Sequence, residues 1–277
     1  MKIDGKIIAG NLIEQLKERV DRLKLKGTTP HLYIITFGND SQTESYLKQK
    51  MLRAGQIGAK ITIKRFNEKT KAQTVYKLIE KLNNDNKIQG VIIQRPIPKQ
   101  LDLETISMSV YVPKDVDGFH PYSKFSSPVA LAVIKLIEST LSDENIYEFL
   151  KSKKITLVGR GVTAGGPIIN LFKKLKIKTQ VVDSKTKDKD MILKKSDIIV
   201  SSVGKKIITV KNLKSGVILI GVGMHTVDGK LKGDYDEAEI ENIASFYSPT
   251  PGGVGPVNVT MLMKNLVEAA EHQFDII

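Results

Sequence analysis

The sequence has 277 residues but contains no cysteine and no tryptophan. The lack of cysteine excludes disulfide bonds, thiolate nucleophiles and cysteine-ligated metals. Its four histidines are scattered without ligand spacing, so we expect no metal ion. No run of about 18 apolar residues occurs, which argues against a membrane-spanning helix. The charged N-terminal segment lacks the apolar centre of a signal peptide, so we expect a cytoplasmic protein that binds no membrane.

Acidic residues are fewer than basic ones, and the net charge of +13 makes a nucleic-acid-binding module an alternative to an enzyme. The lysines are spread along the whole chain, however, and do not alternate with aromatic residues that could stack on bases. The excess is strongest in residues 160–214, which hold 14 Lys and Arg against 4 Asp and Glu. A lobe that binds a phosphate-rich small molecule explains this charge equally well, so we expect no nucleic acid.

The first half of the chain alternates helical and strand patterns, which predicts a parallel α/β sheet. The predicted elements are a helix from Asp4 to about residue 25, a strand at 31–37, a helix at 41–58, a strand at 59–66, a helix at 70–85 and a strand at 90–94. We expect the first helix to bury a stripe of Ile7, Ile8, Leu12, Leu16, Val20 and Leu23. We expect Ser41 to cap the second helix in a capping box with Glu44.

The second half begins with a predicted helix at 127–140 and continues with four strand patterns separated by helices. A glycine-rich turn follows the first of these strands, as in a Rossmann-like nucleotide-binding domain. A last helix follows, with Val259, Leu262, Met263, Leu266 and Ala270 on one face. We therefore predict an α/β protein of two lobes with a cleft: a domain at 1–120 completed by the helix at 257–277, and a Rossmann-like domain at 127–250.

The segment VGRGVTAGGP at 158–167 carries the nucleotide-binding signal, although its third glycine comes one residue late for a strict G-x-G-x-x-G. A strand that ends in bare backbone and passes into a helix N-terminus presents amides to a pyrophosphate. The position of the segment, between KITLV and an apolar helix, favours this interpretation over an ordinary turn.

Three polar stretches of the first half are candidates for parts of a catalytic site. Tyr46 and Lys50 share a helix face at i and i+4; a short-chain dehydrogenase couple is excluded because that couple follows the nucleotide-binding strand. Gln94 ends a buried strand before Pro96, at the edge where ligands of α/β proteins collect. The loop PKDVDGFHP at 113–121 groups acids and a histidine, but ordinary Asx-turn chemistry is an equal alternative.

Proline and glycine crowd the segment SPTPGGVGP at 248–256, just before the last helix. Taken alone, such a cluster is most often a turn. With DGKIIA, FGNDSQTESYLKQK, IIQRPIP, PKDVDGFHP, GRGVTAGGP and DGKLKGD in the same order, the chain resembles the bifunctional methylenetetrahydrofolate dehydrogenase/methenyltetrahydrofolate cyclohydrolase family from end to end. The motifs KDVDGFHP and PGGVGP are particularly specific to that family.

The resemblance implies the following site. The catalytic residues would be Lys50, Tyr46, Gln94 and Asp117. Folate would be bound by Tyr46, Asp117, Gly252, Gly253 and Pro256. The cofactor would be bound by Gly159, Arg160, Gly161, Ser184 and Met224. The expected enzyme oxidises 5,10-methylenetetrahydrofolate to the 5,10-methenyl form and hydrolyses that to 10-formyltetrahydrofolate, within one-carbon metabolism and purine biosynthesis, as a homodimer. A dehydrogenase without the hydrolase step is the alternative enzyme, and the intact Tyr46, Lys50 and Gln94 argue against it.

The chain also departs from the family pattern. Gly161 replaces a common serine, Met224 a common isoleucine and Asp183 a frequent histidine, and the segment at 121–128 is short. Asp183 follows the second Rossmann strand, where a carboxylate favours NAD by binding the ribose diol. Arg160 and the nearby lysines favour a 2′-phosphate instead, and we expect NADP.

Overall fold

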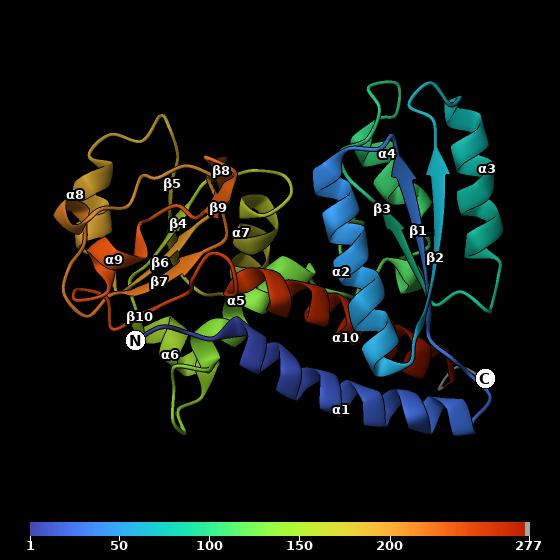
Figure 1. The fold of residues 1–277 in the computed structure, drawn as a ribbon, viewed down its shortest axis with the longest axis horizontal. Coiled ribbons are helices and arrows are strands. Elements are labelled where there is room, and N and C mark those ends of the chain that lie inside the picture. Colours follow the sequence, from blue (N-terminus) through green and yellow to red (C-terminus); the bar gives the residue numbers. More distant parts are fainter. Residues whose placement is uncertain (275–277) are drawn as a thin grey trace. The chain divides into compact units, whose positions relative to one another are not determined.

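The computed structural model describes residues 1–274, which form two compact units. We call them the five-stranded unit, made of Met1–Gly10 and Val129–Asn258, and the three-stranded unit, made of Asn11–Pro128 and the described residues from Val259 onward. Two long helices, α1 (Gly5–Leu25) and α10 (Val254–Phe274), contribute residues to both units (Figure 1). The last part of the predicted helix at 257–277, residues 275–277, lies outside the described residues.

The three-stranded unit is built on a parallel sheet with the strand order β2-β1-β3. Its strands and connecting helices follow the predicted alternation: β1 (His31–Phe37), α2 (Ser41–Ile57), β2 (Lys60–Phe66), α3 (Ala72–Asn83), β3 (Gly90–Ile93), α4 (Leu103–Ser109) and the short 3₁₀ helix η1 (Val112–Lys114). The predicted parallel sheet is confirmed.

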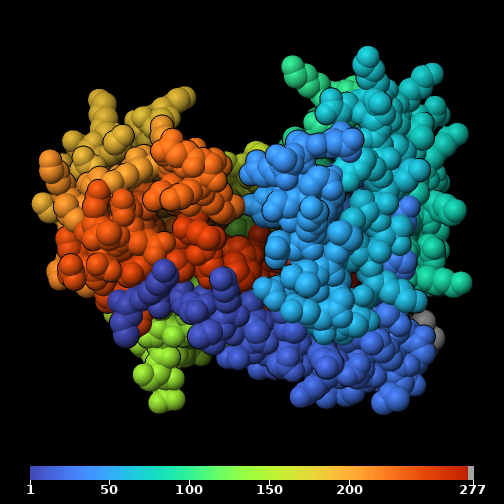
Figure 2. All heavy atoms as spheres, viewed as in Figure 1, coloured from blue at the N-terminus to red at the C-terminus, as the bar shows by residue number. Residues whose placement is uncertain are grey.

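Helices cover both faces of this sheet, because successive side chains of a strand point to opposite faces. Leu32 and Ile34 of β1 pack in one core cluster with residues of α1, α2 and α10. Ile35 and Phe37 of the same strand pack in a second cluster with residues of α3 and α4. In Figure 1 α2 and α3 lie on opposite sides of the strands, and Figure 2 shows α2 as part of the outer surface of this unit.

Two local predictions for these helices are wrong. The N-cap of α2 is Asp40, whose carboxylate accepts from the Thr43 N–H at 2.8 Å, whereas Ser41 already lies in the first turn. Glu44 forms an ion pair with Arg65 at 2.5 Å instead of closing a capping box. Ile7 of α1 is 62% exposed, because the buried face is turned by about one residue and consists of Ala9, Ile13, Leu16, Val20 and Leu23.

The five-stranded unit is also a parallel sheet, with the strand order β10-β7-β6-β4-β5. Its strands are β4 (Ile155–Val158), β5 (Thr179–Val182), β6 (Ile198–Ser201), β7 (Ile218–Gly221) and β10 (Phe246–Tyr247). The chain reverses direction across the sheet between β4 and β6, and doubly wound sheets bind ligands at such a switch point. The prediction of four strands missed β10, which is only two residues long.

The remaining elements of this unit are α5 (Pro128–Glu138), α6 (Ile146–Ser152), α7 (Gly165–Lys174), α8 (Lys189–Lys194), η2 (Val210–Asn212), α9 (Glu237–Ile240) and the hairpin of β8 (His225–Val227) and β9 (Lys230–Lys232). The N-terminal residues join the sheet beside β10: the Ile3 N–H donates to the Tyr247 carbonyl at 2.8 Å. Within residues 1–274 the longest apolar helical stretch falls short of what a membrane span requires.

Candidate functional site

A lysine–glutamine pair lies at the carboxyl edge of the three-stranded sheet. The Gln94 N–H donates to the Ile35 carbonyl at 2.8 Å, which extends the β1–β3 ladder past the end of β3 and fixes the glutamine at that edge. Lys50 Nζ, on α2, donates to Gln94 Oε1 at 2.7 Å. Gln94 Nε2 donates to the carbonyl of Arg95 at 3.0 Å, so the amide is oriented with its oxygen toward the lysine.

The charges around this pair are partly removed from water. Lys50 is half-buried, and burial lowers its pKa, while the negative charge of Asp117 acts in the opposite direction. Burial likewise raises the pKa of the Asp117 carboxyl, against the influence of Lys50. A lysine whose pKa falls toward neutrality can accept or donate a proton during a reaction, which an ordinary surface lysine does poorly.

The two acids of the DVD motif have different surroundings. The Asp115 carboxylate accepts from the Phe119 N–H at 3.4 Å and the His120 N–H at 2.8 Å, so its role is the Asx-turn alternative considered above. The Asp117 carboxylate has no hydrogen-bond partner within residues 1–274. A half-buried carboxylate that forms no hydrogen bond with the described residues is suited to accept hydrogen bonds from a ligand.

Two residues that the sequence analysis did not single out support this loop. Asn265, on α10, is buried and donates through Nδ2 to the carbonyls of Val116 at 2.8 Å and Ser126 at 2.9 Å. Lys114 Nζ donates to two backbone carbonyls, of Leu82 and Asp85, at 2.7 Å each. Lys114 lies within the motif KDVDGFHP, but the bonds of both side chains go to backbone carbonyls that are distant in the sequence, which the motif does not reveal.

Tyr46 lies one turn before Lys50 on α2, as its spacing requires, and is half-buried. Burial raises the pKa of its phenol hydroxyl, which favours the neutral, protonated form of that group. Its hydroxyl bonds to nothing in the part of the chain that the structure describes. The structure therefore joins Lys50 to Gln94 directly and to Asp117 through charge, and it places Tyr46 on the same helix face.

The glycine turn after β4 has the shape of a nucleotide-binding turn. A Cβ added at Gly165, the first residue of α7, would lie 2.3 Å from the carbonyl oxygen of Gly159. Only glycine permits this approach of the helix start to the strand end, which holds the helix N-terminus against the turn. A Cβ at Gly161 would meet open space, so a serine would fit there as well as the glycine that this chain has.

Arg160 and Asp183, the residues that compete over cofactor choice, form an ion pair. Arg160 Nε lies 3.0 Å from Asp183 Oδ2. The other carboxylate oxygen accepts from the Lys185 N–H and the Thr186 hydroxyl, and the Lys185 bond is the main cause of a lowered pKa of Asp183. The terminal nitrogens of Arg160 remain available among the described residues, and its side chain is 59% exposed. Ser184 is exposed next to this pair, and Met224 is half-buried after β7.

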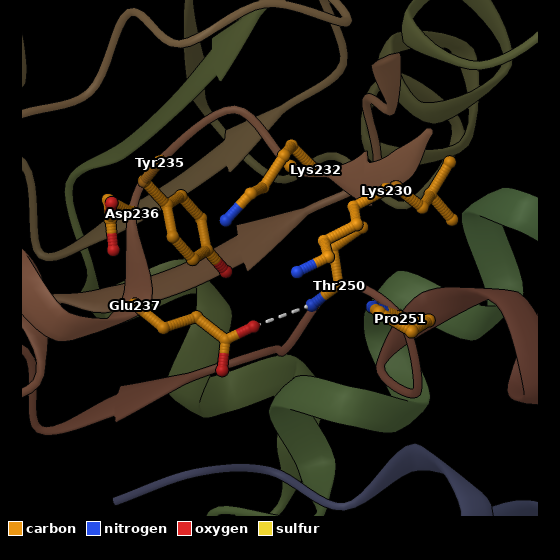
Figure 3. A pocket seen from close by; sticks show the side chains of 9 residues that line it. Lys230, Lys232, Tyr235, Asp236, Glu237, Thr250 and Pro251 are labelled. Carbon is orange, nitrogen blue, oxygen red and sulfur yellow. Dashed lines mark hydrogen bonds between the residues drawn. The ribbon is translucent and has the colours of Figure 1, made fainter. Parts of the chain in front are cut away.

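The proline–glycine loop belongs, up to Asn258, to the five-stranded unit. Packing within the loop explains the glycine at position 253, because a Cβ there would lie 2.6 Å from the Pro249 carbonyl oxygen. Glu237 fixes the loop by accepting from the Thr250 N–H at 2.9 Å (Figure 3). A pocket of about 410 Å³ lies here, lined by β9 lysines, Thr250 and Pro251. Gly252 and Pro256 are half-exposed near the start of α10.

Metal ligands do not gather in the described residues: no group of three or more His, Asp or Glu side chains could hold an ion there.

Two family models match consecutive stretches of the chain. Residues 3–117 match the tetrahydrofolate dehydrogenase/cyclohydrolase catalytic domain, and residues 127–274 match the NAD(P)-binding domain of the same family. A bifunctional protein FolD of Macrococcus caseolyticus is 35% identical over 276 residues, 97% of each chain.

Solved structures of related enzymes share the whole fold. The bifunctional FolD of Campylobacter jejuni has a TM-score of 0.91 and 30% identity, over 98% of this chain and 99% of that one. The Trypanosoma brucei dehydrogenase–cyclohydrolase, solved with NADP cofactor and an inhibitor, has a TM-score of 0.89 and 26% identity over 99% and 98%. The chain belongs to the tetrahydrofolate dehydrogenase/cyclohydrolase family.

Proposed function

We propose that the protein oxidises 5,10-methylenetetrahydrofolate to 5,10-methenyltetrahydrofolate with NADP and hydrolyses the product to 10-formyltetrahydrofolate. The observation that carries this proposal is the half-buried Lys50 bonded to Gln94 beside the open carboxylate of Asp117, in the stretch that matches the catalytic domain. The glycine turn and Arg160, in the stretch that matches the NAD(P)-binding domain, supply the cofactor side.

In this proposal folate binds to residues of the predicted folate domain at 1–120 and 257–277 and to the proline–glycine loop at 248–256. The Asp117 carboxylate accepts hydrogen bonds from the amino edge of the pterin, a pairing in which the acceptor is ionised and therefore strong. Tyr46 offers its ring as a flat apolar surface beside Lys50. The loop residues Gly252, Gly253 and Pro256 contribute backbone that a flat ligand can approach closely.

NADP is held by the five-stranded unit, and the residues present fit it. The close contact of Gly165 with Gly159 leaves the amides of the turn beside the helix N-terminus, where a pyrophosphate is stabilised. The terminal nitrogens of Arg160 and the hydroxyl of Ser184 are open to a 2′-phosphate, and Gly161 and Met224 line the remainder. When bound, the nicotinamide accepts the hydride from the methylene carbon. The protein's own task in that step is positioning.

Lys50 carries the hydrolytic step in the proposal. Its neutral amine accepts a proton from water as the water oxygen bonds to the methenyl carbon, and the resulting ammonium donates that proton to the ring nitrogen as the C–N bond breaks. The added hydroxyl loses its remaining proton to solvent water and becomes the formyl oxygen. Gln94 Oε1 holds the amine in place through both protonation states, since either form has an N–H to donate. The presence of this pair favours the bifunctional enzyme over a dehydrogenase without the hydrolase step.

Two assays on the purified protein test the proposal. With methylenetetrahydrofolate and NADP, the absorbance of reduced nicotinamide should rise, and the rise should be weaker with NAD. With methenyltetrahydrofolate alone, the absorbance of that substrate should decay faster than in buffer. Failure of the first assay with both nicotinamides would refute the dehydrogenase. Tight, salt-sensitive DNA binding in its place would favour the basic binding module.

Further proposals rest on family membership alone. The protein acts in the cytoplasm as a homodimer, and its 10-formyltetrahydrofolate supplies purine biosynthesis. Sedimentation equilibrium tests the dimer, and purine rescue of a deletion strain tests the supply; a monomer, or a strain that grows equally without purines, would contradict them.

A further inference from the structure

Arg95 follows Gln94 directly and contacts the loop that carries Asp117. Its guanidinium carbon lies 3.6 Å from the ring centroid of Phe119. Both side chains are half-buried, and a cation this close to an aromatic face is well within the range of a cation–π contact. Phe119 lies two residues after Asp117, so a side chain from the end of β3 is stacked on the aspartate's own loop.

Arg95, Phe119 and Asp117 also share a small cavity with Asp115. Arg95, Asp115, Asp117 and Phe119 line a space of about 20 Å³, enough for one water molecule, with apolar residues of β3 and α4 around it. The positive charge of Arg95 acts on both carboxylates. Since the loop amides already occupy Asp115, Asp117 is the carboxylate that remains open to a ligand.

We propose that Arg95 is a positioning residue for Asp117: its stacked guanidinium holds the loop in place and presents a second cation, in addition to Lys50, to the folate-binding carboxylate. This inference rests on the proposed function of Asp117. The planar guanidinium is essential to it, because a lysine could supply the charge but not the flat contact with the ring.

The charges that face Asp117 give the sign of the expected pH effect. Lys50 and Arg95 lower the pKa of this carboxyl, whereas burial and Asp115 raise it. Replacing Arg95 by an uncharged side chain leaves Lys50 alone against burial and Asp115. The pKa of Asp117 then rises further, so the ionised carboxylate is lost at a higher pH than in the wild type.

The test compares Arg95→Leu and Arg95→Lys with Arg22→Leu, a control that removes the same charge from an exposed position of α1. Kinetics are measured from about pH 5 to pH 9. Arg95→Leu should raise the KM for methylenetetrahydrofolate on the order of tenfold near neutral pH, with the acid limb of kcat/KM moved to higher pH. The KM for NADP should not change. Arg95→Lys should have the acid limb of the wild type, but its KM for methylenetetrahydrofolate should lie between those of the wild type and Arg95→Leu.

A second readout needs no substrate. The titration of the Asp117 carboxyl, followed by NMR in protein with ¹³C-labelled aspartate and assigned with Asp117→Asn, should move upward in Arg95→Leu and not in Arg22→Leu. An unmoved titration in a variant with wild-type circular dichroism would overturn the proposal, even if the enzyme is active. If the titration moves but no folate turnover exists in the wild type, the proposed function fails while the coupling of Arg95 to Asp117 stands.

Discussion

The two units of the molecule prepare their sites by opposite means. The three-stranded unit takes charges out of water: Lys50 and Asp117 are half-buried, and burial is the largest influence on the pKa of each. The five-stranded unit keeps the charge of Arg160 exposed, with 59% of its side chain accessible, and relies instead on the close backbone approach of Gly159 and Gly165. Proton transfer needs an amine with an altered pKa, whereas a phosphate-rich cofactor needs close amides and an accessible cation. We therefore expect substitutions that change charge to impair the three-stranded unit most, and substitutions that change backbone shape to impair the five-stranded unit most.

The largest effect is expected from Lys50→Met, which removes the buried amine but keeps an apolar chain of similar length. Loss of a general acid–base group should lower the cyclohydrolase rate roughly 10²- to 10⁴-fold. The fold should stay intact, although the free energy of unfolding should fall because the Gln94 oxygen and the Asp117 carboxylate lose their cationic partner. Methenyltetrahydrofolate hydrolysis is the measurement, and Lys48→Met, at an exposed position of the same helix, is the control. Wild-type hydrolysis in Lys50→Met would remove the lysine from the mechanism.

Asp117→Ala should come next, because it removes an ionised acceptor of ligand hydrogen bonds. Folate binding should weaken by about 1.5–3 kcal/mol, while NADP binding should be nearly unchanged. Isothermal titration with each ligand measures both, and Asp143→Ala provides an exposed acidic control. A loss confined to NADP would reverse the assignment of the two units.

Gly165→Ala tests shape in the five-stranded unit without changing any charge. The added methyl would lie 2.3 Å from the Gly159 carbonyl oxygen, so the turn and the helix must separate. We expect a loss of about 1–3 kcal/mol in the free energy of unfolding and a raised KM for NADP. Gly161→Ala, whose methyl meets open space, should leave the free energy of unfolding unchanged. Equal denaturation midpoints for the two variants would show that the close approach is not needed.

The smallest effect concerns the choice of cofactor. Arg160→Ala should lower the ratio of kcat/KM for NADP to that for NAD by about tenfold, corresponding to about 1.4 kcal/mol of lost phosphate binding. Asp183→Ala should keep or increase the ratio, since its carboxylate now occupies one nitrogen of the arginine. A wild-type enzyme that prefers NAD would instead make Asp183 the selecting residue.

The parts of the fold that depend on local pattern could be predicted from the sequence. The alternation of strands and helices, the glycine turn and the helix starting at Gly165 each have a local physical cause. The errors arose where two local solutions compete, as at Asp40 and Ser41, where adjacent residues can both cap a helix. The strand β10 was missed because two residues carry no period.

The candidate site could be predicted only in part, and mainly through the family resemblance. In the sequence, Lys50 and Lys114 are both lysines beside functional motifs. The structure distinguishes them, because Lys114 donates to two backbone carbonyls while Lys50 donates to a glutamine and is influenced by a carboxylate. The contact of Arg95 with Phe119 joins a strand end to a distant loop, and such contacts depend on tertiary packing that no local pattern reveals.

The pKa of Lys50 tests most directly the claim that the three-stranded unit works by taking charge out of water. It can be measured by NMR of lysine labelled at the ε-carbon, with the signal assigned by its absence in Lys50→Met. We predict a value below that of an ordinary lysine, and a still lower value in Asp117→Asn, because the aspartate charge opposes the effect of burial. An ordinary lysine pKa in the wild type, or a rise in Asp117→Asn, would contradict the account.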